Sequence, residues 1–345
     1  MTALDVAPMS DVDASCPIAY RYSARDFRRA PSHAAETVYV IGGLYGNVEA
    51  LHEILRMQAA EARRGSRVSL VFNGDHHWLN VDAASFREIN DTVLAHVAIR
   101  GNVEAALSSP DDADCGCNYP DYVNAEYVAR SNAIMARLRR TGRDFPALTA
   151  AIDALPMIRT IDVGGEAIGI VHGDAELLSG WGFAAERLSP GGKCVSGDQV
   201  TAALTPLDTI ERYFRESGVR AFASSHTCLA HARDYSVDGD ARLIINNGAA
   251  GLPNFLGQSF GLITRISANT TIPPESLYGI TLGTLRFDAL PVRFDQAAWL
   301  RRFHANWAPD SPAYVAYHDR IVSGPHFTPQ DAIGGRVTLN IARGH

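Results

Sequence analysis

The stretch Val38–Leu51, VYVIGGLYGNVEAL, has the pattern of the first strand, tight turn and first helix of an α/β domain. Its β-branched run ends in glycines, and apolar residues then recur at helical spacing from Val48 onward. Turns at strand ends in such domains commonly carry chemical groups. The tip of this turn is instead Gly43, Leu44 and Tyr45, without an acid, a base or an imidazole. The stretch therefore predicts the fold and leaves the purpose of its turn to be explained.

A strand–helix alternation continues along the chain. Segment 67–75 is typical of a second strand, 82–96 of a helix and 97–102 of a third strand. Further on, 157–174 is typical of two strands joined by a hairpin at Gly164-Gly165. Alternation of this kind predicts a sheet with helices packed on its faces.

The chain is predicted to form one domain with excursions. Residues 1–36 are interpreted as an N-terminal extension that is partly mobile, and 37–345 as a single domain. Between about 105 and 155, a loop dense in turn residues precedes two helical stretches. This region is interpreted as an inserted helical cap.

Composition excludes several classes of protein. Apolar residues make up 46% of the chain and charged residues 20%, which is an ordinary globular balance. The net charge of −7 argues against general nucleic-acid binding, and no apolar run is long enough to span a membrane. The acidic N-terminus does not resemble a signal peptide, so we expect a cytoplasmic protein. The five cysteines do not predict a disulfide framework, and the oligomeric state stays open.

Polar residues recur at the turns that follow the predicted strands. The turns carry Gly74-Asp75, Gly101-Asn102, His172-Gly173-Asp174 and Ser225-His226-Thr227-Cys228. Ligands of open α/β sheets bind outside the carboxyl ends of the strands, so these side chains are expected to meet. Taken singly, each is also an ordinary helix cap, turn residue or strand-end histidine. Together, a carboxylate, an amide oxygen and two imidazoles suit a divalent ion such as Mn, Fe or Zn.

The order of these turns resembles that of the calcineurin-like metallophosphoesterases, particularly the small bacterial phosphodiesterase and protein-phosphatase-like branch. The turns are IGGLYGN, NGD, RGNVE, VHGD, SHTC and NNGAAG. The family pattern is Asp-x-His-Gly-Asn, Gly-Asp, Gly-Asn-His-Asp/Glu, His-Gly, Gly-His-Thr-His and Asn-Pro-Gly-Ser. The resemblance runs from about Val38 to Leu262. It implies a four-layer α/β/β/α sandwich of two mixed β-sheets flanked by helices, and a metal-dependent phosphoesterase activity on a small phosphorylated substrate.

The sequence departs from the family at half of the two-metal site. The resemblance implies that one metal is held by Asp75, Asn102, His172 and His226, all of which are present. The positions that would complete the other metal hold Gly43, Tyr45 and Cys228, and Val103 replaces the histidine thought to protonate the leaving group. One metal ion is therefore expected and a second stays open. Gly43 is expected to open space beside the remaining ion, and Tyr45 to offer a phenol to a ligand.

A replacement acid for the leaving group is expected if the protein is a hydrolase. The candidates are His76 and His77, directly after Asp75, and Tyr45. Glu104 stands where the family has the carboxylate that orients the missing histidine, and it is either repurposed or a helix cap. A paired histidine sequence is also typical of one buried and one surface residue.

The cysteines and several further polar residues are candidates for supporting roles. Cys228 is a candidate metal ligand, and Cys115 and Cys117 of the cap loop are candidates for contact with metal or substrate. Asp174 is expected either to orient His172 or to cap the next helix, and Asn247 to shape the phosphate side. No role is assigned to Cys16 or Cys194. Trp181 and Phe183 are interpreted either as a pocket wall or as core.

Three functions remain open from the sequence. The first is a metal-dependent hydrolase of a phosphate ester or anhydride. The second is a non-hydrolytic metal-dependent enzyme on the same scaffold, and the third is a catalytically inactive ligand-binding protein. A dinucleotide-binding reading of GGLYG fails because Ile41 breaks the required glycine spacing.

Overall fold

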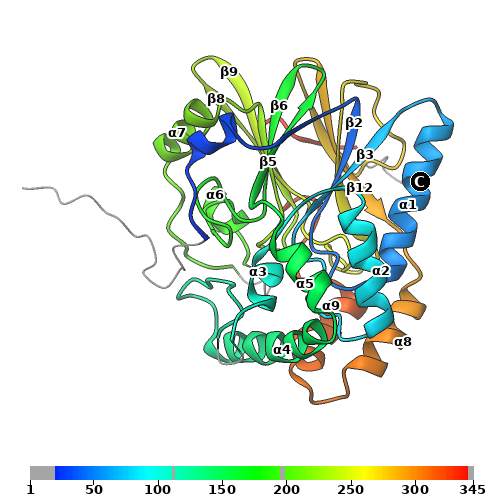
Figure 1. Cartoon of the computed structure of the whole chain (residues 1–345). Helices are drawn as coiled ribbons and strands as arrows, with labels where there is room; N and C mark the ends of the chain where they lie inside the picture. Colours follow the sequence, from blue (N-terminus) through cyan, green and yellow to red (C-terminus); the bar gives the residue numbers. More distant parts are fainter. Residues whose placement is uncertain (1–19, 111–112, 195–198, 341–345) are drawn as a thin grey trace, which may run out of the picture.

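Two mixed β-sheets pack face to face at the centre of the molecule (Figure 1). The computed structural model describes residues 20–110, 113–194 and 199–340. Within these ranges one sheet has the order β14 (Thr338–Leu339), β11 (Tyr278–Leu282), β12 (Leu285–Val292), β10 (Gly261–Ser267), β2 (Thr37–Ile41), β3 (Val68–Asn73) and β4 (Val97–Ile99). The other has the order β1 (Ser32–Ala35), β5 (Ile158–Val163), β6 (Glu166–Val171), β7 (Ala221–Ser224), β9 (Asp240–Asn246), β8 (His231–Val237) and β13 (Ile333–Gly334).

Strand β2 is buried on both of its faces, which explains why four of its five residues are apolar. Val38 and Val40 face the core between the two sheets, whereas Tyr39 and Ile41 face the helices outside the first sheet. All five residues of β2 are buried, as expected for a strand that is covered on both faces. Strand β2 pairs in parallel with β3, and β3 with β4.

Helices cover the outer faces of both sheets, so the predicted four-layer α/β/β/α sandwich is confirmed. The helices packed outside the first sheet are α1 (Val48–Arg63), α2 (Ala83–Leu94) and α8 (Gln296–Asn306). Those outside the second sheet are α7 (Leu207–Ser217) and the short η2 (Ala24–Arg28). The short helix α6 (Ala185–Leu188) lies between β6 and α7 in the chain.

The region predicted as a cap contains three helices. They are α3 (Asn102–Leu107), α4 (Ala125–Arg143) and α5 (Pro146–Asp153). Helix α4 runs across the lower end of the molecule in Figure 1 and packs against α9 (Pro312–Ser323). Two segments more than 150 residues apart in the sequence thereby enclose the same end of the sheets.

The segment before β2 is part of the packed structure from Tyr20 onward. Ala24 and Phe27 are buried in the core under α7, and β1 pairs in parallel with β5. The expected mobility of the N-terminus concerns residues outside the described ranges, as does Cys16. The hairpin predicted at Gly164-Gly165 joins β5 to β6. None of the helices in the described ranges combines the length and apolar character needed to cross a bilayer.

Candidate metal centre

Four strands, two from each sheet, end at a single cluster of polar side chains. Asp75 follows β3 and Asn102 follows β4 in the first sheet. His172 follows β6 and His226 follows β7 in the second sheet. The stacking of the sheets therefore brings together residues that lie up to 151 positions apart in the sequence.

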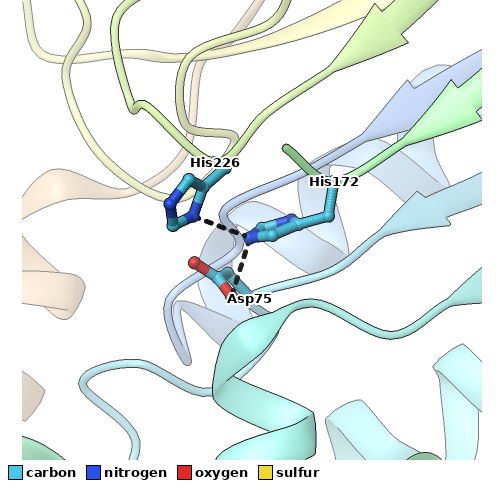
Figure 2. A group of neighbouring side chains, drawn as sticks. All are labelled: Asp75, His172 and His226. Carbon is cyan, nitrogen blue, oxygen red and sulfur yellow. Dashed lines mark hydrogen bonds and ion pairs between the residues drawn. The ribbon is translucent and has the colours of Figure 1, made fainter. Parts of the chain in front are cut away.

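The side chains of Asp75, His172 and His226 point toward one another (Figure 2). The Nε2 atom of His172 lies 3.1 Å from Oδ1 of Asp75 and 3.0 Å from Oδ1 of Asn102. The Nδ1 atom of His226 lies 3.3 Å from the same Nε2. All four residues are buried, with at most 6% of each exposed.

Carbonyl groups behind the two imidazoles determine their tautomers. The Nδ1 atom of His172 lies 2.9 Å from the carbonyl oxygen of Asn73, and Nε2 of His226 lies 3.0 Å from that of Cys117. A carbonyl oxygen only accepts, so each of these ring nitrogens carries the hydrogen. In the neutral rings the opposite nitrogens are lone pairs, and both face the cluster. Asn102 donates its amide to the carbonyl of Cys115, which turns its oxygen inward.

The four side chains of the cluster therefore meet through acceptor atoms, and none of them donates to another; a backbone N–H, that of Val103, donates to Oδ1 of Asp75 at 3.3 Å. Two imidazole nitrogens, one carboxylate oxygen and one amide oxygen converge within hydrogen-bonding distance. Lone pairs repel one another at such distances unless a cation or a proton lies among them. The donor set fits a divalent ion of the borderline class. In the described part of the chain, Asp75, His172 and His226 are the group of potential ligands found within metal-binding reach of one another.

The pKa values of the two imidazoles are shifted in opposite directions. Burial is the largest single effect on the pKa of His172 and lowers it, but the charge and hydrogen bond of Asp75, the Asn73 carbonyl and the charge of Glu104 together raise the pKa. Burial and the neighbouring His172 lower the pKa of His226 well below its usual value. His226 remains neutral, which is the form that binds a metal.

Two glycines allow the ligand-bearing turns to approach closely. A Cβ atom on Gly101 would lie 2.5 Å from Oδ1 of Asp75. A Cβ atom on Gly74 would lie 2.6 Å from Nδ1 of His172, and Gly74 has a φ of 83°. The neighbouring Asp75 also has a positive φ, 55°, which is unfavourable for a side chain other than glycine. This turn is therefore held in place by its surroundings.

Glu104 provides the main restraint on that turn. Its carboxylate accepts hydrogen bonds of 2.8 Å from the backbone N–H groups of Asp75, His76 and Gly101. The residue is fully buried. Of its two expected roles, the structure supports the structural one, and Glu104 holds the backbone that presents the metal ligands. Its carboxylate faces backbone amides, so the catalytic role proposed from the sequence is corrected.

A small cavity borders the cluster and is walled by aromatic rings. Its volume is about 20 Å³, which is room for about one water molecule. The lining residues come from the strand-end turns, the cap and α9: Tyr45, Asp75, Trp78, Asn102, Val103, Cys117, Tyr119, Tyr127, Trp181, His226, Thr227, Cys228 and Tyr317. The polar cluster therefore borders a confined and largely apolar space.

Tyr45 and Cys228 stand at positions that would complete a second metal in the two-metal pattern, and both line this cavity. The hydroxyl of Tyr45 contacts the sulfur of Cys228, which also lies 3.2 Å from the carbonyl oxygen of His226. Burial raises the pKa of Cys228 to about 11, so the sulfur remains a thiol at neutral pH. The expectation that Cys228 is a metal ligand is corrected. Its sulfur is hydrogen-bonded to the Tyr45 hydroxyl and lies outside the group of potential ligands.

Gly43 does not open space beside the cluster. It has a φ of 62°, and a Cβ atom there would lie 3.1 Å from the Cα of Ala249. The turn packs directly against the 248–250 segment, and Gly251 donates its N–H to the carbonyl of Gly43. Glycine is required here by the backbone conformation and this close packing, which corrects the expectation from the sequence.

His76 and His77 are both fully buried and do not line the cavity. The ring of His77 stacks on Phe86 at 4.3 Å, and the ring of His76 packs edge-on against Phe72. Burial lowers the pKa of His77 to about 4. The structure therefore places both histidines in the core beneath α2, and neither is positioned to protonate a leaving group in the cavity.

Asp174 and Asn247 support the backbone around the site. Asp174 accepts hydrogen bonds from the N–H groups of Glu176, Leu177 and Gly182, so it holds its own turn and does not orient His172. The amide of Asn247 donates to the carbonyl oxygens of Gly42 and Leu262. Asn247 thus ties the end of β2 to β10 and lies outside the cavity wall.

The cap loop closes over the cluster, as its cysteines suggested, but through its carbonyl groups. Cys115 and Cys117 are paired as a disulfide, with Cα atoms 5.3 Å apart, which corrects the expected thiolate role of these two residues. Their carbonyl oxygens accept from Asn102 and His226 respectively. The loop therefore orients two of the metal-binding side chains.

The aromatic wall contains residues that the sequence did not indicate. Trp181, which was a candidate, lines the cavity and donates to the carbonyl of Cys117, whereas Phe183 packs in the core with Phe222. Tyr127 of α4 and Tyr317 of α9 complete the wall. They lie in helices far from the strand-end turns in the sequence, so no local pattern connects them to the site.

Comparison with known proteins supports the fold. No protein-family model matches the sequence, and no curated protein matches it significantly. A hypothetical protein from Pyrococcus horikoshii OT3 is similar with a TM-score of 0.54 and 15% identity, over 86% of this chain and 100% of that chain. A metallophosphoesterase from Sphaerobacter thermophilus is similar with a TM-score of 0.49 and 15% identity, over 84% and 99%. At such identities the likeness concerns the fold alone, and the two-sheet fold predicted from the sequence is shared with the hypothetical protein from Pyrococcus horikoshii OT3.

Proposed function

We propose that the protein is a metal-dependent phosphoesterase that hydrolyses a small phosphate ester or anhydride. The ion is a single Mn, Fe or Zn held by Asp75, Asn102, His172 and His226. The observation that carries the proposal is the convergence of four side-chain acceptor atoms with no side-chain donor between them. An ion of this kind lowers the pKa of a bound water and polarises phosphoryl oxygens.

The chain itself supplies the orientation of the ligands and the exclusion of water. The carbonyls of Asn73 and Cys117 fix the imidazole tautomers, and Glu104 fixes the turn that carries Asp75. The aromatic wall leaves room for about one water beside the cluster, in a cavity of about 20 Å³. An ester therefore enters only when side chains of the wall move aside, and it then binds in a space of low polarity where electrostatic interactions are strong.

Tyr45 is the proposed proton donor to the leaving-group oxygen. It lines the cavity, and burial raises its pKa well above 10, so its hydroxyl retains the proton across the physiological range. The other two candidates, His76 and His77, lie in the core and away from the cavity. Donation by Tyr45 requires its hydroxyl to turn from the sulfur of Cys228 toward the substrate.

Metal analysis combined with ester hydrolysis tests the proposal. The wild-type protein and the His226→Ala and His52→Ala variants would be compared for metal content and for hydrolysis of p-nitrophenyl phosphate and bis(p-nitrophenyl) phosphate. His52 is a suitable control because its side chain is 59% exposed on the surface. We expect about one ion per chain and turnover of one ester, both lost in His226→Ala and retained in His52→Ala.

Two results would count against the proposal. Metal binding without hydrolysis of either ester would favour the ligand-binding or non-hydrolytic alternatives, which the confined cavity also suits. Absence of bound metal after loading with each of the three ions would show that the cluster has another purpose.

A further inference from the structure

Arg320 of α9 is a buried cation without a counter-ion. Only 9% of the residue is exposed, and its Nη2 donates 2.6 Å to the carbonyl oxygen of Cys228. Its Nε and Nη1 atoms are buried and have no hydrogen-bond partner among the residues that the structure describes. No carboxylate in the described ranges forms a salt bridge with it. A guanidinium in this state is costly unless an anion compensates its charge.

Arg233 shows how an equally buried arginine is normally satisfied in this fold. It is also 9% exposed, but its guanidinium donates to the hydroxyl of Ser189 and to the carbonyls of Ala232, Asp331 and Ala332. Arg265 and Arg286, which are also buried, each leave one nitrogen without a hydrogen bond, but both pair with carboxylates, Glu61 and Asp288 respectively. What distinguishes Arg320 is its uncompensated charge, which points to an anionic ligand close by.

Arg320 lies directly behind the cavity wall. Its carbonyl acceptor belongs to Cys228, and Tyr317, one turn earlier in α9, also lines the cavity. The guanidinium is therefore on the Tyr45–Cys228 side of the metal cluster.

The hydroxyl of Tyr317 is available as a donor on the same side. It accepts hydrogen bonds from the indole N–H of Trp78 at 2.7 Å and from the hydroxyl of Tyr127 at 3.2 Å. These donors occupy both lone pairs of the oxygen, so the hydrogen of Tyr317 is left for a third group. One helix thus presents a cation and a hydroxyl donor to a single part of the cavity.

The charges around the cluster explain why such a cation is needed. Two buried carboxylates, Asp75 and Glu104, lie at the site and together would neutralise one divalent ion. A site with no net charge attracts an anionic ester weakly. Arg320 adds the positive charge that the single-ion cluster lacks.

We propose that Arg320 and Tyr317 form an oxyanion subsite that binds the non-reacting oxygens of a phosphate group. Tyr317 makes the direct contact from the cavity wall, and Arg320 supplies charge from behind Cys228. The subsite deepens the proposed function and rests on it. It also assigns the substrate to monoesters or other groups with at least two free anionic oxygens, because such groups carry enough charge to balance both the ion and the arginine.

Binding of inorganic phosphate to the metal-loaded full-length protein tests the subsite. Isothermal titration would compare the wild type with Arg320→Met, Arg320→Lys, Tyr317→Phe and Arg215→Met, with metal content measured on each. Arg215→Met is the control because this substitution removes the same charge from a half-exposed position on α7. We expect phosphate affinity to fall about tenfold or more in Arg320→Met, which is about 1.4 kcal/mol. The Lys variant is expected to retain most of the affinity, and metal content to stay unchanged in all.

The outcomes separate this inference from the proposed function. Equal phosphate affinity in the wild type and Arg320→Met, or no binding to the wild type, would overturn the subsite even if esters are hydrolysed. Arginine-dependent phosphate binding without hydrolysis of any ester would support the subsite and overturn the hydrolase. Should Arg320→Met fail to fold, Arg320→Gln and Tyr317→Phe give the same decision by the same titration.

Discussion

The hydroxyl of Tyr45 and the thiol of Cys228 contact each other across the two sheets, at the ends of β2 and β7. Both residues have a positive φ, 57° for Tyr45 and 60° for Cys228, which few side chains other than glycine adopt. Strain of this kind persists only where the surroundings maintain it. The turn after β2 therefore has a definite structural purpose, which is to close one side of the cavity beside the metal cluster.

The first prediction concerns metal stoichiometry. Because Tyr45 and Cys228 bond to each other and lie outside the ligand cluster, Cys228→Ser and Tyr45→Phe should retain about one ion per chain. His226→Ala and Asn102→Ala remove ligands and should lower metal affinity by at least tenfold. Plasma mass spectrometry on desalted protein measures the ion content. A second ion that disappears in Cys228→Ser would show that sulfur does bind metal here.

The second prediction compares two glycines that have nearly the same φ. Gly74 and Gly165 have φ values of 83° and 84°, but a Cβ atom meets His172 at 2.6 Å in the first and open space in the second. Gly165→Ala should cost only the strain of its φ, about 1–2 kcal/mol, and leave metal content intact. Gly74→Ala should also displace His172 and lose the metal. Urea unfolding and metal analysis on both variants check this. Equal metal content in the two would contradict the close approach at Gly74.

The third prediction concerns Glu104. Its carboxylate accepts three backbone N–H groups, so Glu104→Gln replaces one charged acceptor oxygen by a donor that faces another donor. We expect a loss of about 2–3 kcal/mol in the free energy of unfolding, together with weaker metal binding. Glu126→Gln, at a side chain 79% exposed, serves as the control. Unchanged metal affinity in Glu104→Gln would show that the turn keeps its conformation without this restraint.

The fold and the ligand cluster were accessible from the sequence because both depend on local patterns. Each strand is a short apolar run, and each ligand directly follows a strand, so the order of turns in the chain predicts which side chains meet. The four residues Asp75, Asn102, His172 and His226 could be named for this reason. What each neighbouring residue does was less accessible, as His76 and His77 show. The sequence alone does not distinguish a pair of histidines that faces a cavity from a pair that is packed in the core.

The wall of the cavity could not be predicted, because it is made by contacts between distant helices. Tyr127 and Tyr317 are 190 residues apart, and their hydroxyls meet only because α4 packs on α9. Arg320 gives no signal in the sequence, since a lone arginine in an amphipathic helix normally faces solvent. Gly43 was misread for a related reason. Loss of a side chain suggested open space, but the backbone of the 248–250 segment fills it.

The fourth prediction concerns acid stability. Burial lowers the pKa of His231 to about 3, whereas an unfolded histidine has a pKa near 6.5. Below pH 6.5 the unfolded chain binds a proton that the folded chain refuses, so stability declines as pH falls from about 6.5 toward 3. His231→Gln should reduce this slope by up to about 1.4 kcal/mol per pH unit. Urea midpoints between pH 7 and 4.5 measure it, with the exposed His52→Gln as control. Identical slopes in His231→Gln and the wild type would show that His231 is protonated in the folded state.

The last prediction concerns the leaving group and holds if esters are hydrolysed. Tyr45 lines the cavity with a hydroxyl that burial keeps protonated, so Tyr45→Phe should slow the hydrolysis of alkyl phosphates by about 100-fold. Hydrolysis of p-nitrophenyl phosphate should change far less, because nitrophenolate leaves without a proton. The control is Tyr213→Phe, whose hydroxyl bonds to Glu176 and lies outside the cavity wall. Rates for the two ester classes, at equal metal content, measure the effect. An equal loss on both classes would mean that Tyr45 shapes the cavity and transfers no proton to the leaving group.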